Sequence, residues 1–333
     1  MTAGRRDPGD PLRVVTVGGG TGLAAALRGF KHMPWIELTA IITVADDGGS
    51  SGRLRRDLGH PPPGDIRNCL VALAPDESAL AELFQYRFPE GRSGDLAGHS
   101  FGNLFLSALT GMTGSFPEAV RRASVLLASA GRVFPASLED LHLHGRTVRG
   151  EEIAGEWNLG RAAEPLHEVW LEPRHPRAFS PAVRALSQAD LIVLGPGSLF
   201  TSVLPALLVP RIGQALRASA APKVYVCNVM TQPGETAGLD AAGHVAALSR
   251  HLDAGFATHV VCSTADIDPV ELARYRESGA QPVGVDVEAI EAAAGGVRVV
   301  LRDDLLDDGR PRHAPVALCE ALLELAGEAA RWQ

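Results

Sequence analysis

The feature that most constrains this chain is the stretch Val-Val-Thr-Val-Gly-Gly-Gly-Thr-Gly at positions 14–22. Its β-branched residues predict a short buried strand, and the alanine-rich run at 24–27 predicts a helix. A strand, a glycine turn and a helix start form an anion site, because the first helical N–H groups are unpaired and glycines let a phosphate approach the backbone. The pattern is neither a full GxGxxG motif nor a P-loop, so a tight packing turn remains the alternative.

Composition and charge narrow the class of protein. The 333 residues carry a formal net charge of −8, which argues against binding to nucleic acid or to an anionic membrane surface. The cysteines form no CxxC pair, so we expect free thiols in a reducing, cytoplasmic compartment. The apolar segment 191–209 contains glycine, proline and serine, which favours a strand, a loop and a helix over a membrane span. We expect residues 1–12 to be a disordered tail and 13–330 to form one domain.

A second polar loop follows the second expected strand, which covers Glu37 to Val44. This loop, 45–55, reads Ala-Asp-Asp-Gly-Gly-Ser-Ser-Gly-Arg-Leu-Arg. In a doubly wound sheet, the loops at the carboxyl ends of neighbouring strands converge on one crevice. Asp46 is therefore a candidate to bind a ribose hydroxyl, or Mg²⁺ beside a phosphate. A simple turn is the alternative for the Asp-Asp-Gly-Gly run.

Further polar residues stand at expected helix starts. Asp65 has the pattern of an N-cap for the helix that leads into 69–73, and Ser100 and Asn103 begin an amphipathic helix whose unpaired N–H groups could meet a ligand. His99 is a candidate general acid or base, or a phosphate partner, and a capping or packing histidine is the alternative. Between residues 133 and 171 the apolar residues alternate with period two, which predicts a small β-rich insertion.

The second half of the chain repeats the strand, glycine loop and helix pattern. A fully apolar strand at 190–194 precedes Gly195-Pro196-Gly197-Ser198, and we expect a helix from this loop to about Ala218. The next strand, 223–228, ends in amide and hydroxyl side chains that suit a base or sugar edge. The chain therefore predicts an α/β fold: a doubly wound, mostly parallel, Rossmann-like sheet with helices on both faces and a ligand site at its switch point.

Taken together, these motifs resemble the CofD-like superfamily and, within it, the YvcK-type gluconeogenesis factors. The resemblance covers nearly the whole chain, from about Arg13 to the last helix. The most specific segments are 18–22, 44–55, 64–68, 98–103, 195–198 and 228–236. The sequence that follows Asp46 and Asp47 is Gly-Gly-Ser-Ser-Gly-Arg-Leu-Arg. It is similar to the motif of the gluconeogenesis factors and not to that of the transferases.

The resemblance implies a cytoplasmic bacterial protein that binds UDP-sugars such as UDP-N-acetylglucosamine without turning them over. Such proteins support cell shape and peptidoglycan supply during gluconeogenic growth, which implies a protein partner in cell-wall regulation; a homo-oligomer is left open. Tyr275 would stack on the base and Arg312 would pair with the diphosphate, although both could be plain surface residues. The other expected ligand-binding residues are Gly18, Gly19, Gly20, Thr21, Gly22, Asp46, Asp47, Asn103, Gly195, Pro196, Gly197, Ser198, Asn228, Thr231 and Gln232.

The related transferase branch implies the alternative function. Those enzymes move a phospholactate or phosphoenolpyruvate group from a guanosine diphospho-carrier onto a deazaflavin alcohol. On that hypothesis Asp46 or Asp47 would hold Mg²⁺, and His99 or Asp65 would act on the acceptor hydroxyl.

Overall fold

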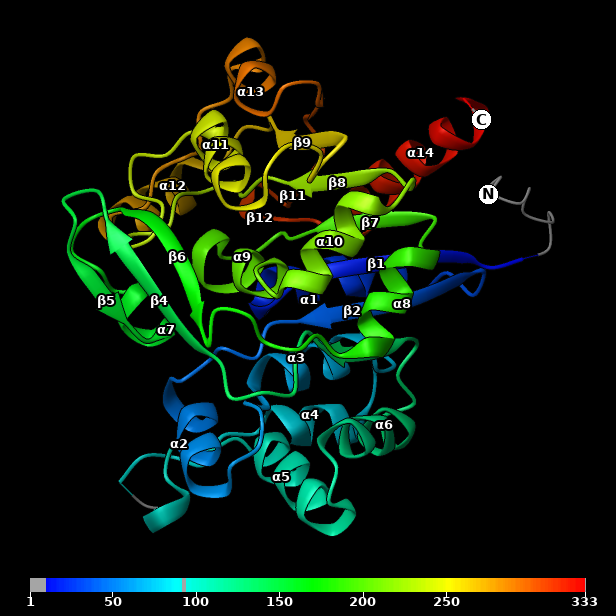
Figure 1. The fold of residues 1–333 in the computed structure, drawn as a ribbon, viewed down its shortest axis with the longest axis vertical. Coiled ribbons are helices and arrows are strands. Elements are labelled where there is room, and N and C mark those ends of the chain that lie inside the picture. The colour runs from blue at the N-terminus through cyan, green and yellow to red at the C-terminus, as the bar shows by residue number, and fades with distance from the viewer. Residues whose placement is uncertain (1–9, 92–93, 333) are drawn as a thin grey trace.

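A seven-stranded parallel sheet forms the centre of the computed structural model, which describes residues 10–91 and 94–332. Its order is β10-β9-β8-β7-β1-β2-β3 (Figure 1), and all neighbouring pairs run parallel. The predicted tail falls largely on residues 1–9, outside the described residues. The strands are β1 Leu12–Gly18, β2 Ile36–Ile42, β3 Arg132–Pro135, β7 Leu191–Leu194, β8 Lys223–Val226, β9 His259–Ser263 and β10 Arg298–Arg302.

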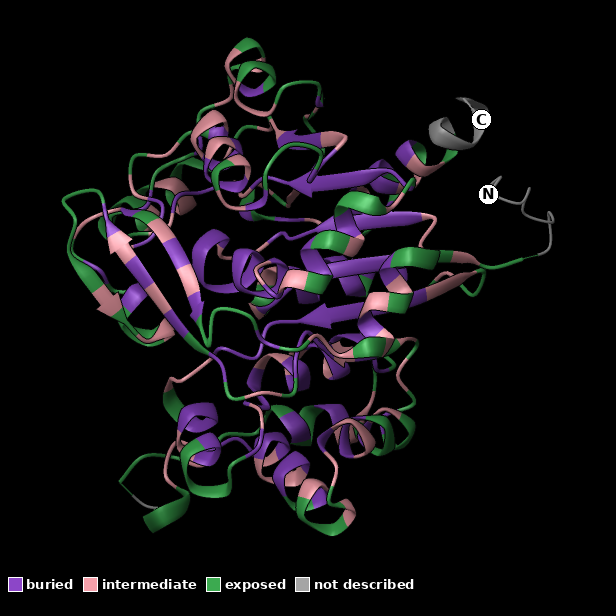
Figure 2. Cartoon of the chain, in the orientation of Figure 1, coloured by how far each residue is buried: buried purple, intermediate pink, exposed green. Residues whose placement is uncertain are grey.

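Helices cover both faces of this sheet, as the sequence predicts. Val14 of β1 belongs to one buried cluster and its neighbour Val15 to the other, because successive side chains of a strand point to opposite faces. Figure 2 shows the central strands buried between the two layers. The helices over the Val14 face are α1 Gly20–Phe30, α3 Gly64–Leu73, α6 Phe116–Leu126 and α14 Pro315–Trp332. Those over the Val15 face are α8 Ser180–Gln188, α9 Leu204–Leu207, α10 Pro210–Ala218, α11 Ala241–Leu252 and α13 Val287–Ala294.

A helical lobe follows β2 and differs from the sequence prediction. The run expected to be a loop at 45–55 contains most of helix α2, Gly49–Leu58. This helix packs against α5, Phe101–Thr113, which also contacts α4, Ala79–Gln85, and α6. The glycines and serines of α2 have low helix propensity, so packing of its buried face decides its conformation. A short 3₁₀ turn, Gly94–Leu96, precedes α5.

The β-rich insertion is smaller than predicted. β3 pairs with β2 in the main sheet, so the insertion is a separate three-stranded antiparallel sheet in the order β5-β4-β6. Its elements are β4 His142–Thr147, β5 Glu152–Ala154, α7 Glu156–Leu159 and β6 Leu166–Glu172. The alternating pattern begins in β3 because an edge strand of the main sheet also has one exposed face.

The segment after β7 is also more broken than the single helix that we expected. It contains a π-helical turn, Leu199–Val203, and then α9 and α10 as separate helices. Among the described residues, no single helix is long and apolar enough to cross a membrane; one bent pair, Leu199–Leu207 with Pro210–Ala218, meets the length and composition criteria with a 79° bend.

The C-terminal part adds α12, Pro269–Glu277, and the two-stranded pair β11, Leu306–Asp307, with β12, Arg310–His313. β12 contacts both α1 and α12. Residues more than 250 positions from the glycine turn therefore lie beside the helix that this turn begins.

Candidate functional site

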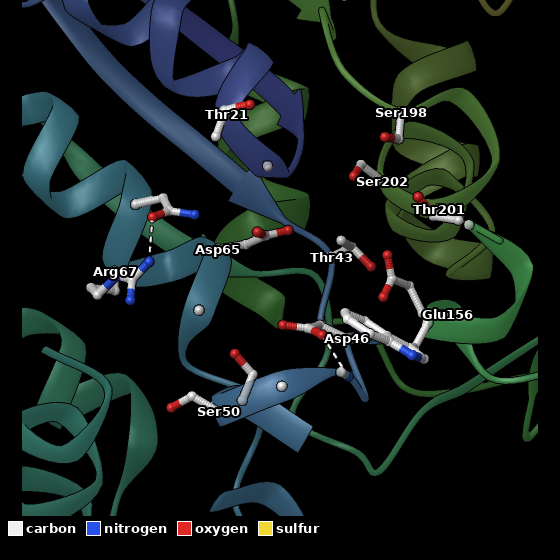
Figure 3. A pocket seen from close by; sticks show the side chains of 18 of the residues that line it. Thr21, Thr43, Asp46, Ser50, Asp65, Arg67, Glu156, Ser198, Thr201 and Ser202 are labelled. Atoms are coloured by element: carbon white, nitrogen blue, oxygen red, sulfur yellow. Dashed lines mark hydrogen bonds between the residues drawn. The ribbon is translucent and has the colours of Figure 1, made fainter. Parts of the chain in front are cut away.

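Two cavities open where the carboxyl ends of the central strands meet. β1 lies between β2 and β7, so the loops after these strands face one another at the switch point of the sheet. The acidic cleft, about 580 Å³, lies toward the β2 side and is lined by Asp46, Asp65, Arg67, Glu156 and neighbours (Figure 3). The C-terminal cleft, about 600 Å³, is lined by Asn228, Gln232, Tyr275, Arg312 and neighbours. Both clefts share Gly20, Thr21 and Ser198.

The glycine turns let the two loops at the switch point touch. A Cβ on Gly22 would lie 2.7 Å from the carbonyl oxygen of Pro196, closer than real contacts allow. Gly20 has φ +67°, which favours glycine. Gly19 precedes α1 without any side-chain cap, and Asp65 accepts from the Gly20 N–H, so the N–H groups that follow Gly20 in the first turn are the ones open to a ligand. The geometry therefore supports the packing role of this turn, and anion binding stays a prediction.

Two aspartates come together in the acidic cleft from different elements. Asp46 follows β2 and accepts a hydrogen bond from the Gly48 N–H at 2.9 Å, and burial raises the pKa of its carboxyl. Asp65 lies in the first turn of α3, whose N-cap is Pro63, so the prediction that Asp65 is the N-cap is wrong. Burial, and then the charge of Asp46, raise the pKa of Asp65 to about 6.

Gly19 is what makes room for the second of these carboxylates. A Cβ at position 19 would lie 2.4 Å from Oδ2 of Asp65. Position 19 therefore favours glycine, because a carboxylate from α3 occupies the space of a side chain. The sequence pattern does not reveal this contact.

The insertion supplies a third carboxylate that sequence reasoning missed. Glu156, the first residue of α7, lines the acidic cleft. Burial, together with the charges of Asp46 and Asp65, raises its pKa to about 8. Asp47 holds α7 in place by accepting a hydrogen bond from the Trp157 N–H at 2.9 Å, and so Asp47 acts as a structural link rather than as part of the cleft lining.

His99 lies behind the cleft rather than in its lining. Its Nδ1 is 3.0 Å from the Ser50 hydroxyl, and the Asn103 amide donates to the same hydroxyl at 3.1 Å. The histidine is 7% exposed, and burial lowers its pKa, so it stays neutral. Ser50 and Asn103 do line the cleft. This geometry favours the packing alternative for His99.

The C-terminal cleft has a different construction. The Asn228 amide donates to the Gly197 carbonyl at 2.9 Å and accepts from the Gly197 N–H at 3.2 Å. The Gln232 amide donates to the Ser198 hydroxyl at 2.8 Å. These amides, which we expected to contact a base or sugar, hold the 195–198 loop in place. Thr231 lines the same cleft, whereas Gly18 and Gly195 line neither.

Tyr275 and Arg312 reach the C-terminal cleft from the end of the chain. Tyr275 lies on α12 and Arg312 on β12, where Arg312 pairs with Asp307 at 2.7 Å. The structure thus brings both residues beside the glycine turn, as a shared nucleotide site requires.

The carboxylates of the acidic cleft fit a magnesium ion only if a bound ligand supplies further oxygen atoms. Within residues 10–91 and 94–332, no group of three or more His, Cys, Asp or Glu side chains is arranged to hold a metal. Asp46 and Asp65 share the acidic cleft, and Mg²⁺ typically takes one or two carboxylates together with phosphate oxygens and water.

Comparisons with known proteins agree with the motifs. A family model described as 2-phospho-L-lactate transferase CofD matches residues 14–305. A protein named gluconeogenesis factor from Bacillus subtilis is 45% identical over 298 residues, which are 90% of this chain and 92% of that protein. Its namesake from Halalkalibacterium halodurans is 44% identical over 315 residues, 93% and 95% of the two chains. A crystal structure of a UPF0052 family member from Bacillus halodurans is 43% identical with a TM-score of 0.89, and the match covers 94% of this chain and 99% of that one.

Proposed function

The chain belongs to the CofD family, and from this membership we propose that it binds a UDP-sugar, such as UDP-N-acetylglucosamine, as a regulatory protein without turnover. Its role would be to support peptidoglycan supply and cell shape during gluconeogenic growth, through a protein partner that responds to the bound state. Relatives of similar length that are named gluconeogenesis factors support this proposal.

One observation carries the proposal: the two clefts are joined through Gly20, Thr21 and Ser198. A nucleoside diphosphate sugar has three parts in a row, and the joined clefts offer three matching environments. The diphosphate would lie on the N-terminus of α1, where helical N–H groups and small side chains suit it. The base would lie against Tyr275, and Arg312 would exchange part of its contact with Asp307 for a phosphate oxygen.

The sugar would then extend into the acidic cleft. Asp46 and Asp65 present carboxylate oxygens there, and these accept hydrogen bonds from sugar hydroxyls. Asn103 adds a buried side-chain oxygen that has no hydrogen-bond partner within the described part of the chain. A polyhydroxylated ligand satisfies such acceptors, because a hydroxyl both donates and accepts.

Titration calorimetry with the purified full chain tests the proposal. UDP-N-acetylglucosamine and UDP-glucose should bind, GDP and GTP should not, and the sugar nucleotide should be recovered intact. Tyr275→Ala should weaken binding about tenfold or more, since aromatic stacking on a base is worth about 1–3 kcal/mol. Arg312→Gln should weaken it similarly, whereas Arg310→Gln, on the same strand but outside the cleft, is the matched control. No binding of any UDP-sugar at millimolar concentration would contradict the proposal.

A transferase is the second candidate, and the three carboxylates of the acidic cleft favour it. Groups whose pKa is raised toward neutrality typically serve proton transfer. Asp46 and Asp65 are the residues that would hold Mg²⁺, which would neutralise charge on a diphosphate. The acceptor hydroxyl would lose its proton to a cleft carboxylate while its oxygen bonds to phosphorus and the P–O bond to the nucleotide breaks. Incubation of a guanosine diphospho-carrier with a deazaflavin alcohol should then give a new product, which Asp46→Asn abolishes.

A further inference from the structure

Arg67 is a buried cation that makes no ion pair within the described residues, and the charges of Asp65 and Asp46 act on it only from a longer distance. It lies on α3, lines the acidic cleft and is 6% exposed. Its Nη1 donates to the Ser100 hydroxyl and its Nη2 to the side-chain oxygen of Asn68 at 2.6 Å, and both partners are neutral. Its Nε is buried and has no partner among the described residues. A buried guanidinium in such surroundings is costly unless something supplies negative charge.

A second buried arginine, in the neighbouring helical lobe, meets this cost with a carboxylate. Arg55, on α2, is 7% exposed, and it donates from Nε to the Asp140 carboxylate at 2.7 Å. For Arg67 no carboxylate lies within ion-pair distance in the described part of the chain. Asp65, two residues earlier on the same helix, is turned toward the Gly20 N–H instead. Of these two buried arginines, Arg55 therefore has a carboxylate partner, and Arg67 lines the cleft without one in the described residues.

A second positive charge lies close to Arg67. Arg87, which follows α4, also lines the acidic cleft and donates to the carbonyl of Gly98 at 2.6 Å. After burial, the charge of Arg87 is the next cause that lowers the pKa of Arg67, to about 10. Two like charges in one cleft repel each other, and an anion bound between them relieves that repulsion.

The surroundings of the two arginines suit an oxyanion. The N-terminus of α2 faces the same cleft through Gly48, Gly49 and Ser50, and its N-cap, Gly48, makes no side-chain capping bond. Helical N–H groups and a serine hydroxyl therefore supplement the guanidinium donors. In Figure 3, Arg67 and Glu156 lie on opposite sides of the cleft, with Asp65 and Asp46 between them.

We infer that Arg67 and Arg87 form an anion subsite in the acidic cleft that binds a carboxylate or phosphate group. The inference rests on the proposed function in one respect: it takes a uridine nucleotide to be bound next to this subsite. The group belongs either to the far end of a UDP-sugar, as in a uronic acid, or to a separate small acid beside the nucleotide. In both cases the oxyanion of the ligand would contact the arginines, and any hydroxyls that the ligand carries would face Asp46 and Asp65.

Calorimetry on the full chain with UDP, UDP-glucose and UDP-glucuronate tests the first source. UDP-glucuronate should bind about tenfold more tightly than UDP-glucose, because hydrogen bonds between a guanidinium and a carboxylate are stronger than those between neutral groups. Arg67→Gln should remove this preference and leave UDP affinity within about twofold. Inorganic phosphate added to the UDP-saturated protein tests the second source; it should bind to the wild type and not to Arg67→Gln.

Controls separate the subsite from general damage. Arg87→Gln, at an exposed position, should reduce the same preference even if Arg67→Gln is poorly folded, and Arg67→Lys should keep part of it. Arg53→Gln, a nearby arginine that bonds the Ala97 carbonyl outside the cleft lining, should change nothing.

The outcomes distinguish this inference from the proposed function. Phosphate binding that depends on Arg67, in a protein that binds no uridine nucleotide, would support the subsite and refute the proposed function. If neither the glucuronate preference nor phosphate binding responds to Arg67→Gln or Arg87→Gln, the anion subsite does not exist.

Discussion

The acidic cleft and the C-terminal cleft meet at the same glycine turn, yet they are built from opposite chemistry. In the acidic cleft, partly buried carboxylates with raised pKa values lie beside Arg67, which is buried. In the C-terminal cleft, the amides of Asn228 and Gln232 are already bonded to the 195–198 loop. The ion pair between Arg312, in its lining, and Asp307 is about half exposed and adds little stability.

The two clefts should therefore differ in function: ligand binding in the acidic cleft should depend on charge, and binding in the C-terminal cleft should depend more on shape. Buried charges change their protonation or their partners when a ligand enters, because desolvation is their main cost. The amides of the C-terminal cleft, already bonded to the 195–198 loop, supply fixed contacts, and the cations that line it, Arg28 and Arg312, lie at exposed positions. We therefore expect pH and anions to act mainly through the acidic cleft, and base identity to be read in the C-terminal cleft.

The largest predicted effect comes from a change that damages both clefts together. In Gly22→Ala the new methyl group would meet the backbone carbonyl of Pro196 at 2.7 Å, and backbone cannot move away cheaply. We expect a loss of about 3 kcal/mol in the free energy of unfolding, measured by urea denaturation, and weaker UDP binding.

Gly111→Ala is the matched control for this change. Gly111 is also helical, in α5, but a Cβ there would have nothing within 4 Å. It should stabilise the protein by about 0.5–1 kcal/mol, because alanine favours helix. An unchanged stability of Gly22→Ala would mean that the two loops do not pack as described.

The next prediction concerns a buried carboxylate that supports one cleft more than the other. Glu235 is 2% exposed and accepts a hydrogen bond from the Thr201 N–H at 2.8 Å. Thr201 lines the acidic cleft only. Glu235→Ala leaves this N–H unpaired, so it should cost about 2 kcal/mol of unfolding free energy and weaken phosphate binding more than UDP binding. Glu235→Gln keeps an acceptor and should cost less; equal costs would refute the hydrogen-bond role.

Much of the main sheet could be predicted from the sequence, because its central strands are apolar on both faces and end in glycine turns. The doubly wound arrangement is confirmed. The elements that were missed depend on packing: α2 has a polar, glycine-containing sequence, and β3 shares its alternating pattern with the insertion. Local pattern cannot assign such segments, because tertiary contacts override propensity.

The residues of the candidate site also differ in how far the sequence predicts them. Loop residues such as Asp46 and Ser198 could be named because the carboxyl ends of neighbouring strands converge. Glu156 could not, because α7 reaches the cleft through a separate sheet. Arg67 was part of a recognised motif, yet its burial without an ion pair within the described residues is visible only in three dimensions. The Asn228 amide looked available for a ligand because sequence does not show which hydrogen bonds the fold has already used.

The smallest predicted effect tests the acidic cleft alone. A carboxyl whose folded pKa is raised binds a proton more tightly in the folded than in the unfolded protein, so its contribution to stability is lost as pH rises through the folded value. For Glu156, whose pKa is raised to about 8, the loss between pH 7 and pH 9 is on the order of 1 kcal/mol. Glu156→Gln should remove this part of the pH dependence, which thermal unfolding across that range would measure.

Other carboxylates keep the test specific to this range. Asp65 and Glu235, with pKa values near 6 and 7, lose their contributions to stability mostly below pH 7 in both proteins. Removing Glu156 should therefore change the slope from about pH 5 up to about pH 8, and the part above pH 7 is where Glu156 is the main remaining cause. Parallel curves would mean that Glu156 ionises normally and that the acidic cleft is more hydrated than its burial implies. In that case the contrast with the C-terminal cleft would rest on the arginines alone, because only Arg67 would still be a charge held out of water.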